Sequence, residues 1–216
     1  MKRTNISFPC GSLSLEGVWQ LPEGSGPFPV VVLCHPHPAY GGSMCNNVIL
    51  ALASTLVSKA IAAFSFNFRG VGRSGGRSGS GIDEQRDVVA AIDFVGSRRE
   101  VDINNLGLAG YSFGAGVALP VAVKDERVKA LALVSLPLGL ADIDELKSYP
   151  KPKLLICGSD DFIASSQEME LIVQELAPPK QFELIPGADH FWWGYEEEMA
   201  EKVSSFLASF LKRTNT

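Results

Sequence analysis

The segment GYSFG at residues 110–114 contains the residue types that most directly point to chemistry. It follows the apolar run 106–109 and precedes a helix-like stretch at 115–124, so its serine falls on a strand-to-helix turn. Glycines two residues before and after a serine leave room for a sharp turn that exposes the hydroxyl group. The pattern predicts a nucleophilic serine at Ser112.

A second stretch, residues 72–76 around Ser74, has the same G-x-S-x-G spacing. More Gly, Ser and Arg follow it, and no apolar helix does, so its context does not support a nucleophile. Residues 70–75 also read G-x-G-x-x-G, as in a dinucleotide site, but further loop residues follow the third glycine where such a site needs a helix. We read this segment as a connection whose arginines pair with Glu84 or Asp87, or attract an acidic substrate.

The chain that must position Ser112 alternates strand-like and helix-like segments, which predicts an α/β sandwich with a mostly parallel sheet of about eight strands. Continuous apolar runs such as residues 30–33 are typical of strands buried on both faces. The expected strands are two antiparallel ones within 6–20, then 29–34, 60–68, 106–109, 128–136, 153–157 and 181–185. The expected helices are 46–59, 84–97, 113–124, 165–175 and 196–212.

Ligands of such sheets bind at the carboxyl ends of the strands, and three reactive groups are expected there. Ser112 follows one strand, Asp160 and Asp161 follow 153–157, and His190 follows 181–185. An imidazole can take the serine proton, and a carboxylate can orient the imidazole and stabilise its charged form. The residues alone do not decide between the two adjacent aspartates.

The order serine, acid, histidine is the order of the α/β-hydrolase triad, and nearly the whole chain resembles that superfamily. The segments 35–42, 66–74 and 187–191 are similar to those of small, lidless bacterial hydrolases related to dienelactone hydrolases. The resemblance implies Asp161 as the acid, three residues beyond the strand-terminal Gly158, with Asp160 as the alternative. Only residues 137–150 separate two strands where many relatives carry a cap, so no cap domain is expected.

The resemblance also implies an oxyanion hole made by two backbone N–H groups. Phe113, which follows the nucleophile, supplies one, and by analogy with other loops of the fold His37 supplies the other. His35 is expected to fix the loop geometry. Trp192 and Trp193 follow His190 and are candidates for the wall of the substrate pocket, with a place in the core or its cover as the alternative.

Length, composition and charge narrow the class of protein. A chain of 216 residues with 46% hydrophobic residues is expected to form a single domain, residues 1–216. A net charge of -5 gives no general attraction to nucleic acid or anionic lipid. No secretory h-region and no long apolar span are found, so we expect a cytoplasmic protein. The four cysteines lack metal-ligand spacing, and neither a metal nor a cofactor is expected.

The sequence thus predicts a serine hydrolase that cleaves small carboxylic esters or thioesters through Ser112, His190 and Asp161. Dienelactone-type or peptidase chemistry on the same fold is the first alternative. A binding protein that kept the fold without activity is the second. The expected partner is a small ester substrate, and the sequence does not indicate an oligomeric state.

Overall fold

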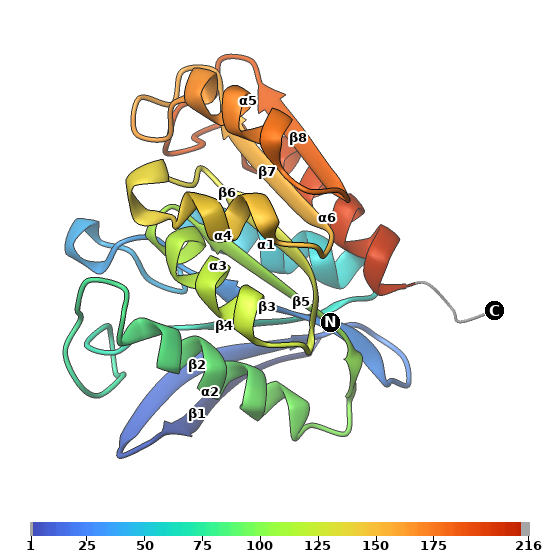
Figure 1. Cartoon of the computed structure of the whole chain (residues 1–216). Coiled ribbons are helices and arrows are strands. Elements are labelled where there is room, and N and C mark those ends of the chain that lie inside the picture. The colour runs from blue at the N-terminus through green and yellow to red at the C-terminus, as the bar shows by residue number, and fades with distance from the viewer. Residues whose placement is uncertain (1, 213–216) are drawn as a thin grey trace.

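The computed structural model describes residues 2–212 and places an eight-stranded sheet at the centre of the molecule (Figure 1). The strands are β1 (Lys2–Cys10), β2 (Leu13–Leu21), β3 (Phe28–Cys34), β4 (Ala62–Phe66), β5 (Val101–Tyr111), β6 (Val128–Val134), β7 (Lys153–Gly158) and β8 (Lys180–Ile185). Their order in the sheet is β1-β2-β4-β3-β5-β6-β7-β8. β1 and β2 pair antiparallel, as do β2 and β4, and all other pairs are parallel. The predicted, mostly parallel sheet is confirmed.

Helices cover both faces of this sheet (Figure 1). They are α1 (Asn47–Ser58), α2 (Glu84–Gly96), α3 (Phe113–Lys124), α4 (Ile143–Ser148), α5 (Ser166–Glu175) and α6 (Glu196–Leu211), with short 3-10 turns η1 (Pro38–Tyr40) and η2 (Leu138–Leu140). Apolar side chains of α1 and α6 form the core on one face, and those of α2 and α3 form the core on the other. Because each face carries its own core, the central strands are buried on both sides, as their continuous apolar runs predict.

The structure differs from the sequence-based expectation most at three elements. β1 begins at Lys2 rather than at Ile6. β5 begins at Val101 rather than near Leu106, because Val101 already pairs with Phe28 of β3, ahead of an irregularity in the register of the two strands. The helix α4 was not expected. Its first turn is capped by the Asp142 carboxylate, which accepts a hydrogen bond of 3.0 Å from the Glu145 N–H.

The connection from β6 to β7 consists only of residues 135–152, which hold η2 and the short helix α4. In the part of the chain that the structure describes, no inserted domain covers the carboxyl edge of the sheet, so the predicted lack of a cap domain is confirmed. Between residues 2 and 212 no helix is both long and apolar enough to cross a bilayer.

Candidate active site

Ser112 lies between β5 and α3 in a strained backbone conformation. Its φ is 54° and its ψ is -119°, a region that residues other than glycine rarely adopt. The Ser112 N–H donates to the carbonyl of Val134 at the end of β6, at 2.9 Å, which fixes the turn to the neighbouring strand. The sharp strand-to-helix turn predicted at residues 110–114 is therefore present.

The two glycines of this turn are required by close backbone approach. A Cβ atom at Gly110 would lie 2.3 Å from the Gly114 carbonyl oxygen. A Cβ atom at Gly114 would lie 2.2 Å from the carbonyl oxygen of Cys34, the last residue of β3. The start of α3 therefore packs directly on Gly110 and on the end of β3. A larger residue at Gly110 would push α3 away from β5, and a larger residue at Gly114 would push α3 away from β3.

Ser112, His190 and Asp161 form one hydrogen-bonded row. His190 Nε2 lies 2.9 Å from Ser112 Oγ, and His190 Nδ1 lies 2.9 Å from each carboxylate oxygen of Asp161. A carboxylate only accepts, so Nδ1 carries the ring proton, and in the neutral ring Nε2 is free to accept from the serine hydroxyl. All three side chains are almost fully buried. The arrangement can withdraw a proton from Ser112 when its oxygen attacks an electrophile.

Asp161 is held by several groups besides His190. Its Oδ1 accepts hydrogen bonds from the N–H groups of Ile163 at 3.0 Å and Ala164 at 2.7 Å. Burial raises the pKa of Asp161, but the hydrogen bonds from His190, the Ala164 N–H and Ser135 lower it by a larger amount. The pKa of this carboxyl group is therefore below its usual value. The carboxylate thus stays charged next to the imidazole.

Asp160, the alternative acid, is exposed and its Oδ1 accepts a hydrogen bond of 2.8 Å from the Ser159 hydroxyl. The structure therefore brings Asp161, and not its neighbour, to His190.

The two residues expected to form the oxyanion hole lie side by side. The rings of His37 and Phe113 meet edge to face with centroids 4.7 Å apart. Within residues 2–212, neither backbone N–H donates to another protein group. Two N–H groups without a protein partner among these residues, one of them on the residue after Ser112, have the character of an oxyanion hole, and this role stays a prediction.

His35 links the β3 loop to the segment that follows β4. Its Nε2 accepts a hydrogen bond of 3.1 Å from the Phe68 N–H, so the ring proton lies on Nδ1, which donates to the Pro36 carbonyl at 2.7 Å. Burial lowers the pKa of His35 to about 4. The ring is therefore neutral and structural, as the sequence indicates, and it steadies the loop that carries His37.

This buried ring makes stability depend on pH. Because its pKa is about 4 in the folded state and about 6.5 in the unfolded state, the unfolded chain binds more protons between these values. The free energy of unfolding should fall by about 2 kcal/mol between pH 7 and pH 5 through this group alone. Urea unfolding followed by tryptophan fluorescence measures it. Between pH 7 and pH 5, the free energy of unfolding of His35→Gln should fall by about 2 kcal/mol less than that of the wild type. The same pH dependence in both proteins would contradict the assignment of a neutral, buried His35.

The two candidate pocket tryptophans lie in different environments. Trp192 is fully buried in the core formed with α1 and α6, and its Nε1–H donates to Ser135 Oγ at 3.0 Å. The expectation that Trp192 walls the pocket is therefore wrong, because a fully buried indole presents no surface to a substrate. Trp193 is 71% exposed, and its place in the pocket stays a prediction.

Sequence analysis missed two residues that support the triad. Ser135 is fully buried at the end of β6 and hydrogen bonds with Asp161. The Tyr111 hydroxyl donates to the His190 carbonyl at 2.5 Å and so fixes the backbone of that residue. A polar residue directly after an apolar strand could have identified Ser135. The expected strand, however, extended over residues 128–136, so Ser135 was placed inside it.

Hydrogen bonds and ion pairs to neighbouring residues hold the Gly-rich segment between β4 and α2 in place. The buried carboxylate of Glu84 accepts hydrogen bonds from the N–H groups of Gly79 and Gly81. Arg69 pairs with Asp87 at 2.8 Å, as expected. Arg73 instead pairs with Glu16 on β2, at 3.1 Å. These contacts support a structural connection, and in residues 2–212 no three potential ligand side chains are placed to share a metal ion.

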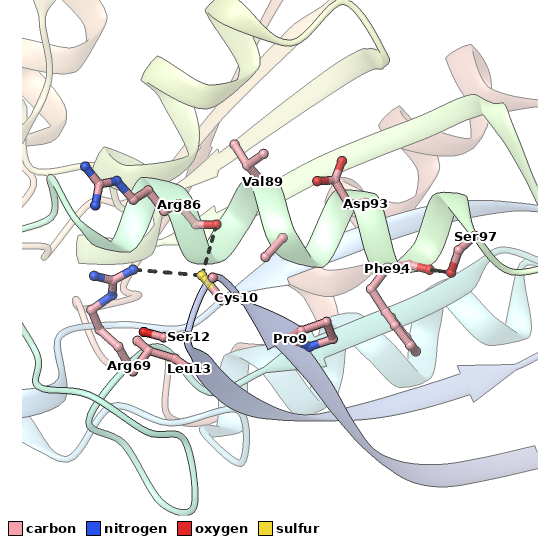
Figure 2. A pocket seen from close by; sticks show the side chains of 12 residues that line it. Pro9, Cys10, Ser12, Leu13, Arg69, Arg86, Val89, Asp93, Phe94 and Ser97 are labelled. Carbon is pink, nitrogen blue, oxygen red and sulfur yellow. Dashed lines mark hydrogen bonds between the residues drawn. The ribbon is translucent and has the colours of Figure 1, made fainter.

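A cavity of about 610 Å³ lies away from the triad, between the β1–β2 turn and α2 (Figure 2). Cys10 and Arg69 line it, and none of the predicted site residues does. The Cys10 thiol donates to Asp87 at 3.3 Å, and burial raises its pKa to about 11. A smaller hollow of about 230 Å³ borders Phe113, the residue after Ser112.

Comparison with known proteins agrees with this geometry. Residues 29–151, more than half of the chain, match the sequence profile of the alpha/beta hydrolase fold family. The protein belongs to the α/β hydrolase fold family. The predicted membership of this superfamily is confirmed.

Other members of the family resemble the chain over most of its length. An uncharacterized protein of Rickettsia prowazekii is 29% identical over 187 residues, which are 83% of this chain and 78% of that protein. A structure described as an alpha-beta serine hydrolase homologue from Coxiella burnetii is 30% identical with a TM-score of 0.86, covering 95% of this chain and 97% of that one. A Xanthomonas campestris structure, described as a serine hydrolase without lid, is 29% identical with a TM-score of 0.85, covering 99% and 97%.

Proposed function

We propose that the protein is a serine hydrolase that cleaves small carboxylic esters or thioesters through an acyl-enzyme. The observation that carries the proposal is the row of hydrogen bonds from Asp161 through His190 to Ser112, with each of its distances at 2.9 Å. The family and its serine hydrolase neighbours support this reading. The four free thiols support a reducing compartment, the cytoplasm.

In the first half of the reaction, Ser112 Oγ attacks the substrate carbonyl carbon while its proton passes to His190 Nε2. The carbonyl oxygen becomes an oxyanion, which the N–H groups of His37 and Phe113 stabilise. The bond from carbon to the leaving oxygen or sulfur then breaks, and His190 gives its proton to the leaving group. Asp161 keeps the ring oriented and stabilises its charged form throughout.

In the second half, water attacks the acyl group on Ser112 and passes a proton to His190 Nε2. The acid leaves when the ester bond to Oγ breaks, and the serine takes the proton back. No step needs a metal or a cofactor. Lactones and aminoacyl amides are the rival substrates on the same fold.

A fluorophosphonate probe tests the nucleophile directly, because its phosphorus bonds to an activated serine oxygen with loss of fluoride. Peptide mass spectrometry should find the adduct on Ser112 and not on Ser74, which matches the same G-x-S-x-G pattern. A parallel panel of aryl esters, thioesters, lactones and aminoacyl amides then ranks the substrates. An unlabelled Ser112 together with no turnover would favour a binding protein instead.

A further inference from the structure

Large apolar side chains that face solvent gather in the loops at the carboxyl edge of the parallel strands. They come from the loops after β3, β4, β6, β7 and β8, and are Tyr40, Ile82, Leu140, Phe162, Ile163, Phe191 and Trp193. This is the edge at which Ser112 and His190 lie. Exposed apolar groups gathered on one part of a surface mark a binding site more often than scattered ones do.

Two of these side chains lie beside the proposed base. Phe191 follows His190, and the two rings meet edge to face with centroids 5.9 Å apart. The ring of Phe162 lies 6.3 Å from that of Phe191. Phe162 is 75% exposed and Phe191 is 47% exposed, so the protein leaves most of this aromatic surface uncovered.

Hydrogen bonds hold the backbone at both phenylalanines. Phe162 follows Asp161, and the next two residues donate their N–H groups to that carboxylate. The Phe191 N–H donates to Asp189 at 2.9 Å, and the Phe191 carbonyl accepts from Asn47 at 3.0 Å. An exposed aromatic pair on a fixed backbone is prepared to bind an apolar group with little loss of conformational entropy.

The chemistry of the proposed reaction says which part of a substrate reaches this pair. The leaving alcohol must take its proton from His190 Nε2, so it lies on the side of the histidine. The carbonyl oxygen points instead to the N–H groups of His37 and Phe113, the first residue of α3. Because Phe191 contacts the ring that protonates the leaving group, the alcohol portion is the part of the ester that we assign to the phenylalanine pair.

We propose that Phe162 and Phe191 bind the alcohol portion of the substrate, and that this portion is an aromatic or similarly bulky apolar group. The inference rests on the proposed ester hydrolysis and names its leaving-group specificity. Aromatic pairs in contact prefer edge-to-face or offset geometry, which the two rings can offer to a third ring.

The test compares acetates that differ only in the alcohol. Benzyl acetate and 2-methoxyethyl acetate have alcohols of similar acidity and form the same acetyl-enzyme, so their kcat/KM ratio reports binding of the alcohol. Phe162→Ala and Phe191→Ala should each lower the ratio of benzyl to methoxyethyl ester by about 3- to 10-fold. Leu171→Ala, which removes an exposed apolar side chain from α5, should leave it unchanged. Phe191→Leu should restore part of the loss.

A second pair of substrates places the ring on the other side of the ester. The kcat/KM ratio of ethyl phenylacetate to ethyl acetate should not respond to either phenylalanine variant. Equal losses for both pairs, or an unchanged benzyl ratio, would overturn the inference while ester hydrolysis stands. A wild-type dimer in sedimentation that Phe191→Ala dissociates would also overturn it, because a second copy would then cover the pair. Failure of the wild type to cleave any ester would remove the proposed function as well.

Discussion

Ser112→Ala should lower kcat for ester hydrolysis by about 10⁶-fold, the size of loss found when the nucleophile of a serine hydrolase triad is removed. The reason is that, among residues 2–212, His190 Nε2 has no hydrogen-bonding oxygen other than Ser112 Oγ, at 2.9 Å. Steady-state rates on an activated aryl acetate measure the effect. The variant should keep its fold, because the Ser112 hydroxyl bonds only to the imidazole among residues 2–212, while the N–H that fixes the turn is retained.

Ser74→Ala is the matched control for this substitution. Ser74 has the same flanking glycines, but its hydroxyl donates to the Asn67 carbonyl at 2.8 Å and accepts from the Glu16 N–H at 3.0 Å. Its loss should reduce stability and leave kcat near that of the wild type. If Ser112→Ala retained more than about 1% of the wild-type kcat, the acyl-enzyme mechanism would be wrong.

Asp161→Asn should lower kcat by about 10⁴-fold. The amide keeps the size of the side chain, but it loses the charge that stabilises the imidazolium. Its NH₂ group also stops it from accepting at both oxygens, so the ring of His190 is free to take the wrong tautomer. The same aryl acetate assay measures the effect.

Asp160→Asn tests the specificity of that result, because it makes the same chemical change one residue earlier. Asp160 is exposed and bonds to Ser159, so its variant should have a kcat within about twofold of the wild type. A large loss at position 160 with a small one at 161 would reverse the assignment of the acid.

Much of the fold followed from the sequence, because its signals are local. The apolar runs of β3 and β6 identify strands buried on both faces, and the glycines around Ser112 identify a turn that excludes other side chains. The start of β5 did not follow, since it depends on the pairing of Val101 with Phe28 of β3, which is distant in sequence. The presence of α4 did not follow either, since this helix is short and its signal is the single capping side chain of Asp142.

The sequence predicted those site residues that chain order and topology identify. It did not predict those whose place in the site depends on the direction of the side chain. Ser112 and His190 each follow a strand, and their place at one edge of the sheet comes from topology. The choice of Asp161 over Asp160 needed coordinates, because neighbouring residues on a turn point to different sides. For the same reason the sequence could not reveal that Trp192 turns inward to Ser135.

The short passage from β6 to β7 has a consequence for the fate of the acyl group. With only residues 135–152 at this point, the connection carries no inserted domain that could close over an intermediate and expel bulk solvent. A dilute alcohol or amine would therefore compete with water at its bulk concentration for reaction with the acyl group. We expect partitioning to favour release of the free acid, so transacylation should be a minor outcome for this protein.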